Sequence, residues 1–177
     1  MKLMKTLLTC TGLLMTFGMA QAADMQVEMN QLTPEGTGDA IGWVTISESE
    51  YGLVFTPQLK SLPPGRHGFH IHENPSCEPA EKDGKMNPGG AAGGHYDPDN
   101  TGMHGTPFGE GHLGDLSALH VDEDGRALYP VLAPRLKKLE EIKGRALMVH
   151  SGGDNYSDTP EKLGGGGSRI ACGVIKK

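Results

Sequence analysis

The stretch GFHIHE, residues 68–73, alternates two apolar residues, Phe69 and Ile71, with two histidines, His70 and His72. Because the side chains of a strand point alternately to its two faces, the histidines would share one face and lie several ångströms apart. That spacing suits one metal ion that accepts a nitrogen from each ring. The pair alone would also fit exposed or hydrogen-bonded histidines, so the rest of the sequence has to decide.

Outward from this stretch, the sequence has the pattern of an all-β domain. Its 177 residues are enough for one domain with a core, and it contains 27 glycines but only 5% aromatic residues. Glycine, proline, asparagine and aspartate recur between short apolar runs, which favours strands joined by turns. Eight short strands fit a closed or sandwiched antiparallel barrel. The candidate strands cover residues 25–32, 41–47, 53–58, 67–72, 116–121, 127–131, 146–150 and 169–175.

Two long segments between these strands lack a strand pattern. Residues 73–114 are rich in glycine, proline, asparagine and aspartate, and residues 151–168 end in GGGGS. Loops of this length are usually functional or disordered, and the histidines and cysteine of the first segment favour function. The segment PRLKKLEEIKG, residues 134–144, has a helical charge pattern but is short, so we expect a loop or a single helical turn there.

The N-terminus has the pattern of a secretory signal peptide. Two lysines precede an apolar run at residues 6–19, and AQA at residues 20–22 has the small-x-small form of a cleavage site. We therefore expect a signal peptide over residues 1–22 and one mature domain over residues 23–177. A membrane anchor is the weaker interpretation, because the run is shorter than the roughly 20 residues that span a bilayer.

Removal of such a leader changes the charge and the cysteine count. The formal net charge of −6 becomes −8, because Lys2 and Lys5 are lost with the leader. An acidic domain without basic clusters argues against nucleic acid or an anionic membrane as a partner. Cys10 also leaves, so Cys77 and Cys172 remain as an even pair in an oxidising compartment, which favours a disulfide over two separate thiols.

Further potential ligands decide how the His-x-His pair is interpreted. They are His95 in GGHYDP, His104 in MHGTP, His112 and Asp115 in HLGDL, and His150 at the end of ALMV. With the first pair this makes seven potential ligands, more than one tetrahedral ion needs, so two sites are implied. Three histidines and a carboxylate in one loop suit zinc, whereas histidines on strands, without thiolate or carboxylate, suit copper.

The motifs GFHIHE, GGHYDP, HLGDL and GGSRIACGVI together resemble the copper/zinc superoxide dismutases. The signal peptide, the long segment around Cys77 and the short loop after His150 resemble the bacterial periplasmic branch of that family. This resemblance covers essentially the whole mature chain. It implies an eight-stranded antiparallel Greek-key β-barrel, flattened and immunoglobulin-like, with the metal site beneath two long functional loops.

The resemblance also implies an activity and its cofactors. The expected reaction is dismutation of superoxide to oxygen and hydrogen peroxide by Cu(II)/Cu(I) cycling in the periplasm, with one copper and one zinc per subunit. Superoxide is the expected partner, membrane insertion is not expected, and a homodimer is allowed.

Carried over to this sequence, the resemblance assigns a role to each motif residue. The implied copper ligands are His70, His72, His95 and His150, and the implied zinc ligands are His95, His104, His112 and Asp115. The ring of His95 would bridge the two metals and carry a proton during catalysis. Arg169 would guide the anion at the copper, and Cys77 and Cys172 would form the disulfide.

Two further roles are less defined by the sequence. A carboxylate is expected to join a copper ligand to a zinc ligand, and Asp158 is preferred for it, with Asp154 as the alternative in the same loop. Lys82 and Lys85 are candidates for steering superoxide, although both would also fit ordinary solvated lysines. His67 is expected to make a structural hydrogen bond and His120 to face solvent.

Two other functions compete with a dismutase. A copper-binding or metal-delivery protein could use the same fold without turnover, but it has little use for an anion-guiding arginine. A zinc hydrolase could use three histidines and an aspartate to activate water, but it leaves His70, His72 and His150 unexplained.

Overall fold

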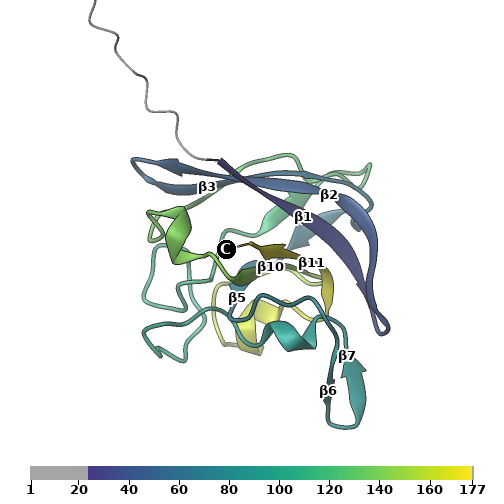
Figure 1. Ribbon diagram of the computed structural model, residues 1–177. Helices are drawn as coiled ribbons and strands as arrows, with labels where there is room; N and C mark the ends of the chain where they lie inside the picture. The colour runs from purple at the N-terminus through teal and green to yellow at the C-terminus, as the bar shows by residue number, and fades with distance from the viewer. Residues whose placement is uncertain (1–23, 177) are drawn as a thin grey trace, which may run out of the picture.

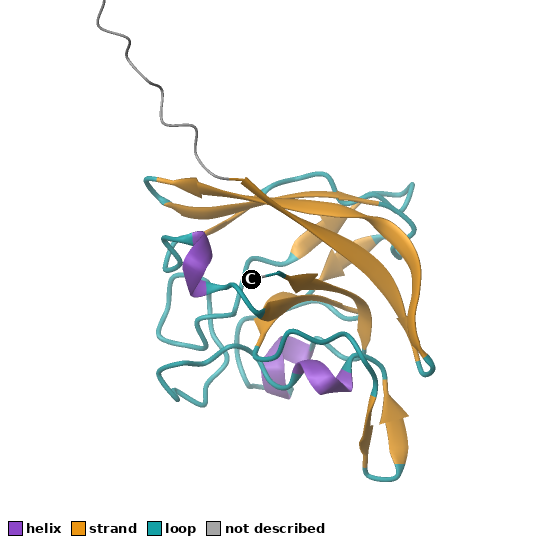
Figure 2. Ribbon diagram, in the orientation of Figure 1, coloured by secondary structure: helices purple, strands orange, loops and turns teal. Residues whose placement is uncertain are grey.

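The fold is a curled antiparallel sheet whose strands are joined by long loops (Figures 1 and 2). The computed structural model describes residues 24–176, so the expected leader over residues 1–22 lies outside the described part of the chain. Regular structure in this range consists of strands of three to 14 residues and three short 3₁₀ helices. The strands are β1 (Asp24–Thr33), β2 (Gly36–Ser49), β3 (Gly52–Leu59), β4 (Gly65–His67), β5 (Phe69–His72), β6 (Ala80–Lys82), β7 (Lys85–Asn87), β8 (Leu119–Val121), β9 (Val131–Ala133), β10 (Arg145–His150) and β11 (Arg169–Ile175), and the 3₁₀ helices are η1 (Gly90–Ala92), η2 (Leu139–Glu141) and η3 (Lys162–Gly165).

Seven of the strands form one sheet in the order β5-β10-β11-β1-β2-β3-β9, and β4 pairs separately with β8. Strands that are distant in the chain, such as β5 and β10 or β3 and β9, are therefore neighbours, as in Greek-key connections. The sheet curls around an apolar core in which Phe55 of β3 and Phe69 of β5 pack edge to face, with ring centroids 6.0 Å apart. The prediction of an all-β fold is confirmed. Within residues 24–176, no helix is long and apolar enough to cross a membrane.

Three details of the predicted strands are corrected by the structure. The strand expected over residues 67–72 is divided at Gly68, where the chain leaves β8 as partner and takes β10. The strand expected over residues 127–131 is displaced to β9, and Ala127 forms only a single bridge with Leu59. Pro130 explains the displacement, because proline has no N–H for the ladder and is tolerated best just before a strand. The strand expected over residues 116–121 is limited to β8.

The long segment after β5 contains a hairpin that the strand pattern did not reveal. Strands β6 and β7 pair with Lys82 opposite Lys85, and the hairpin projects from the body of the molecule (Figure 1). Asp83 and Gly84 form its turn with φ angles of 54° and 73°. Positive φ at both central residues is typical of a type I′ turn, for which Asp-Gly is a strong sequence signal.

The segment over residues 134–144, for which a loop or a single helical turn was expected, contains the single-turn helix η2.

The two edges of β5 explain why distant loops meet beside it. One edge pairs with β10, and the other forms bridges from His70 to Asp115 and from His72 to His95. Ile71 completes these contacts by donating its N–H to Gly114 O and accepting the N–H of Tyr96. A Cβ on Gly114 would lie only 2.3 Å from Ile71 O, so this close approach requires glycine.

The disulfide expected between Cys77 and Cys172 is present, with Cα atoms 5.7 Å apart. It joins the loop that follows β5 to the middle of β11, across 95 residues of sequence. Cys172 is fully buried, and Met148 packs in the same small cluster. The bond therefore fixes the outer loop against the sheet close to the strands that carry the histidines.

Candidate metal centre

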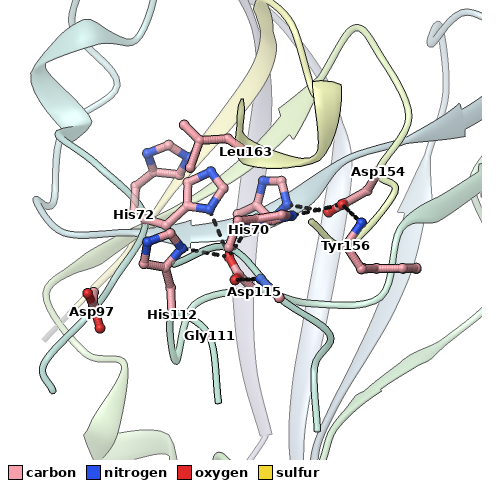
Figure 3. Close-up of polar contacts among 12 residues, drawn as sticks. His70, His72, Asp97, Gly111, His112, Asp115, Asp154, Tyr156 and Leu163 are labelled. Atoms are coloured by element: carbon pink, nitrogen blue, oxygen red, sulfur yellow. Dashed lines mark hydrogen bonds and ion pairs between the residues drawn. The ribbon is translucent and has the colours of Figure 1, made fainter. Parts of the chain in front are cut away.

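All seven expected ligands lie in one buried cluster beside β5, and none is more than 8% exposed. Figure 3 labels four of them: His70, His72, His112 and Asp115. Strand β5 supplies two of them, the end of β10 supplies one, and the loop between β7 and β8 supplies the rest. Two overlapping groups of four have ligand atoms within 4.8 Å of one another. The first consists of His70, His72, His95 and His150, and the second of His70, His95, His104 and Asp115. The first group is the expected copper set, whereas the second contains His70 in place of His112.

The outer nitrogens of the copper-side histidines are held by acceptors. His70 Nε2 lies 2.8 Å from Asp154 Oδ2, and His72 Nδ1 lies 3.0 Å from the carbonyl oxygen of Gly93. His150 Nδ1 points at Gly167 O from 3.4 Å. Because a carbonyl or carboxylate oxygen can only accept, each of these nitrogens carries the ring proton and the other nitrogen is free to ligate a metal.

The free nitrogens face one another and fit a metal. His70 Nδ1 and His95 Nε2 are buried and have no hydrogen-bond partner within residues 24–176, and His72 Nε2 lies 3.4 Å from His150 Nε2. Buried polar atoms without partners are costly and uncommon in folded proteins. A cation placed among these four imidazole nitrogens satisfies all of them, and such a donor set suits copper.

The second set of donors surrounds one oxygen of Asp115. Its Oδ1 lies 2.8 Å from His95 Nδ1, 3.1 Å from His104 Nδ1 and 3.3 Å from His112 Nδ1. A tetrahedral zinc with bonds of about 2.0–2.1 Å holds its ligand atoms roughly 3.3 Å apart. His112 therefore belongs beside Asp115, although its ring is the most exposed of the set, and three nitrogens with one oxygen make a donor set suited to zinc.

Asp154, rather than Asp158, joins the two halves of the cluster. Its two carboxylate oxygens accept from His70 Nε2 and His104 Nε2, each at 2.8 Å. Asp158 contacts neither ring, because its oxygens accept the backbone N–H groups of His104 and Leu163. The preference for Asp158 was therefore wrong. The two aspartates share one loop, and only its folded path shows which one reaches the rings.

Burial sets the protonation of the copper-side histidines. Loss of solvent lowers the pKa values of His70, His72 and His150, and repulsion between neighbouring rings contributes to this in each case. The same causes lower the pKa of His95 to about 3. These rings are therefore neutral at neutral pH, and a metal at the inner nitrogens of His70, His72 and His150 does not have to displace a proton.

His104 behaves in the opposite way. Burial alone would lower its pKa, but hydrogen bonds to Asp115 and Asp154 outweigh burial and raise the pKa to about 9. Burial would raise the pKa of each of these two carboxyl groups, but their histidine partners hold both pKa values below the ordinary range. Binding of a cation at His104 therefore competes with a proton.

Arg169 lies next to the copper side of the cluster and is held by backbone carbonyls. It is paired with His150 in the register of β10 and β11. Its guanidinium donates to Gly89 O and Gly93 O, and Gly93 O is the same oxygen that accepts from His72 Nδ1. The disulfide anchors the loop that carries both glycines, so it also fixes the position of the arginine charge.

Only one of the two candidate steering lysines lines the same hollow as Arg169. Lys82 and Arg169 border the same surface hollow, which has a volume of about 370 Å³. Lys85 borders a neighbouring hollow with Lys82 and Ser168. Of the two, Lys82 is better placed to act on an anion that approaches Arg169.

One residue of the site has no motif that would have pointed to it. Arg135, between β9 and η2, donates to the carbonyl oxygens of Pro107, Gly111 and His112. A single guanidinium thus holds three carbonyls of the loop that carries the zinc-side histidines. Lone arginines give no functional signal in a sequence, since only the folded chain shows which carbonyls they reach.

The remaining two histidines lie where the sequence suggested. His67 is buried, and its ring nitrogens lie 2.7 Å from His150 O and 2.8 Å from Pro63 O. It is therefore a structural link between the end of β10 and the turn before β4. His120 is exposed on β8, next to the ring of Tyr129.

Comparisons with known proteins identify the family. Residues 40–175 match the family model "Copper/zinc superoxide dismutase (SODC)". "Superoxide dismutase [Cu-Zn] 2" of Salmonella typhimurium is 61% identical over 173 residues, which cover 98% of this chain and 96% of the relative. The solved copper/zinc superoxide dismutase of Brucella abortus is 58% identical, with a TM-score of 0.86 over 87% of this chain and 100% of that one. A solution structure of the monomeric enzyme from Salmonella enterica is 62% identical, with a TM-score of 0.79 over the same shares. Taken together with the two buried donor sets and the curled antiparallel sheet, these matches show that the chain belongs to the copper/zinc superoxide dismutase family, whose fold is a Greek-key β-barrel.

Proposed function

We propose that the buried cluster beside β5 is the catalytic centre of this superoxide dismutase. His70, His72, His95 and His150 would hold copper, and His95, His104, His112 and Asp115 would hold zinc. The observation that carries this assignment is the set of buried inner nitrogens, two of them without any hydrogen-bond partner within the described residues. When bound, copper supplies the alternation between Cu(II) and Cu(I) that takes an electron from one superoxide and gives it to the next.

The protein contributes a preformed set of neutral donors. Acceptors at Asp154, Gly93 and Gly167 hold the outer ring protons, so the inner lone pairs point at the metal position without rearrangement. Imidazole ligands serve both oxidation states of copper, whereas hard oxygen ligands would favour the oxidised state. The donor set therefore suits a site that has to cycle.

His95 is the residue placed to hold and release a proton. Its Nδ1 belongs to the zinc-side group around Asp115, and its Nε2 faces the copper-side histidines. A pKa held at about 3 by burial means that the ring does not keep a second proton at neutral pH. With zinc at Nδ1 in place of the ring's own proton, Nε2 would be the one nitrogen of His95 that can take up and release the proton that product formation needs.

Arg169 supplies the positive charge that superoxide requires. The formal net charge of the chain is −6, so long-range attraction has to come from a local field. The two carbonyls that hold the guanidinium leave its charge fixed beside His150 and His72. A fixed fork of donors can orient a small anion as well as attract it.

We also propose that the enzyme acts in the periplasm after removal of residues 1–22. The N-terminal pattern supports export, and the disulfide suits an oxidising compartment. The oligomeric state stays a prediction. A homodimer is allowed, but one relative that is 62% identical is described as monomeric. Sedimentation of the mature chain distinguishes the two.

The function is tested by measuring superoxide dismutation per bound copper on the mature, disulfide-bonded protein loaded with copper and zinc. We expect a rate near the diffusional ceiling that falls as ionic strength rises, because attraction to Arg169 is screened by salt. Arg169→Ala should lower this rate without loss of copper. Full copper occupancy with negligible turnover would reject the catalytic assignment and favour metal binding or delivery.

A further inference from the structure

A further hollow lies over β11, β1 and β2, apart from the histidine cluster. It has a volume of about 410 Å³ and is bordered by side chains of these strands and by the loop that carries Cys77. In the order of the sheet, β10 and β11 separate β1 from β5, so this hollow is not the approach to the copper side. Sites for small molecules commonly have volumes in this range.

Trp43, the only tryptophan of the chain, borders this hollow and is 45% exposed. The next residue of β2, Val44, is fully buried, so the indole ring lies on the outer face of the sheet. Trp43 is paired with Glu28 in the register of β1 and β2. Because the Cβ atoms of such a pair lie about 4.5–5.5 Å apart, a carboxylate stands directly beside the indole ring.

Three polar side chains of β1, those of Gln26, Glu28 and Asn30, also border the hollow. They alternate with the buried Val27 and Met29 and therefore share the outer face, at intervals of roughly 7 Å. The two amide side chains can both donate and accept hydrogen bonds, whereas the carboxylate only accepts. The hollow thus presents a row of donors and acceptors next to an aromatic ring.

Charge and polarity narrow the class of ligand that fits. Glu28 and Glu78 both border the hollow and would repel an anion. An apolar ligand would remove water from the polar side chains of β1 without replacing the lost hydrogen bonds. A cation would suit the carboxylates and the indole, but it would leave the amide donors unused and would meet Lys176 at the same border. The hydroxyl groups of a sugar both donate and accept, and the C–H face of its ring packs on an aromatic side chain.

We propose that this hollow is a saccharide-binding site, in which Trp43 stacks on a pyranose ring and Gln26, Glu28 and Asn30 bind its hydroxyl groups. The best ligand is a β-linked glucoside, because all hydroxyl groups of its ring are equatorial and both ring faces expose only C–H groups. Binding there needs neither copper nor zinc, so it is a function separate from dismutation.

The test uses cellobiose as the probe and the mature, disulfide-bonded protein loaded with copper and zinc. Because the chain has one tryptophan, a fluorescence change reports binding at this hollow. We expect saturable binding with a dissociation constant on the order of 1 mM, since the cost of association offsets most of the gain from one stacked ring. Trp43→Ala, followed by saturation-transfer NMR of the sugar, should weaken binding at least about tenfold, and Trp43→Tyr should recover part of the loss.

Two further variants and a second probe complete the test. Gln26→Ala should weaken cellobiose binding about threefold, as expected for the loss of one hydrogen bond. Tyr51→Ala removes an exposed aromatic side chain from the turn between β2 and β3 and should leave binding unchanged. An unchanged dismutation rate in each variant shows that the fold is intact. The absence of saturable binding by the wild-type protein, or equal binding by Trp43→Ala, would overturn the proposal. Binding of choline without binding of cellobiose would also overturn it and would identify a cation site.

Discussion

At the scale of single residues, the site depends on which nitrogen of each histidine carries its proton. Asp154 orients two rings at once, because its two oxygens accept from His70 Nε2 and His104 Nε2 and so turn each Nδ1 toward its donor set. His70 belongs to the copper side and His104 to the zinc side. The carboxylate therefore orients ligands of both metals from outside the cluster.

We expect Asp154→Ala to weaken zinc binding by about 10- to 100-fold, the usual loss when the hydrogen-bond partner of a metal ligand is removed. Competition with a chromophoric chelator measures this affinity on the mature protein. Asp158→Asn is the matched variant from the same loop, and it should change zinc affinity far less, because Asp158 contacts backbone rather than rings. Equal losses in the two variants would show that the loop as a whole, rather than the Asp154 carboxylate, orients the rings.

The sequence predicted residue types better than it predicted their partners. The seven ligands could be found because histidines and Asp115 are distinctive and their motifs recur in order. Asp154 and Asp158 could not be separated, since both follow His150 closely and only the path of the loop brings one to the rings. The acceptors Gly93 O and Gly167 O are backbone groups, which no residue type reveals.

At the scale of elements, the zinc-side loop is held from outside by Arg135. Three carbonyls of one loop accept from a single guanidinium, which lies in the connection between β9 and η2. A planar fork with five donors can make such contacts together, whereas a lysine cannot. The geometry of His112 therefore depends on a segment that contributes no ligand.

We expect Arg135→Ala to weaken zinc binding and to increase amide hydrogen exchange in residues 104–112, because the loop loses its external donors. Arg135→Lys should recover little of the protection from hydrogen exchange, since lysine restores the positive charge but not the planar set of guanidinium donors. Arg126→Ala is the control, as Arg126 makes only exposed ion pairs with Asp122 and Asp124. Unchanged exchange in Arg135→Ala would show that the metal-binding loop holds its shape without this contact.

The two candidate steering lysines are paired with each other on either side of the turn of the β6–β7 hairpin. We expect Lys82→Ala to lower the second-order rate for superoxide by about twofold at low salt and to weaken its salt dependence, because Lys82 shares the hollow with Arg169. Lys85→Ala should have a smaller effect, since Lys85 does not border that hollow. Stopped-flow rates over a range of ionic strength measure both, and a larger effect of Lys85 would reverse the assignment.

Strands were predicted well where their own hydrophobic pattern marked them. They were predicted poorly where the pairing partner changed or where the strand was too short to show a pattern. Alternating patterns or short apolar runs located β1, β2, β3, β10 and β11. At Gly68 the pattern continues but the pairing partner changes, which a single-strand pattern cannot show. The β6–β7 hairpin was missed even though Asp83-Gly84 is a strong turn signal, because its strands are only three residues each.

At the scale of the whole molecule, the buried cluster makes stability depend on pH before metals bind. The histidines with lowered pKa values take up protons in the unfolded chain below about 6.5 but resist them when folded. The unfolded state then binds more protons, so stability falls as pH drops from about 6.5 toward 3. Asp115 and Asp154, whose pKa values are also lowered, add to this loss at the acidic end.

His104 has the opposite effect above neutrality. Its folded pKa of about 9 exceeds the unfolded value, so its contribution to stability is fully present below about 6.5 and is lost as pH rises through 9. We therefore expect the mature, metal-free, disulfide-bonded protein to be most stable near pH 6.5, measured as urea midpoints from pH 4 to 10. Metal-free His104→Gln should lose the decline between pH 6.5 and 9 and keep the acidic one. A wild-type midpoint that rises steadily to pH 10 would show that Asp115 and Asp154 do not hold a proton on His104, and that zinc binds this ring without proton competition.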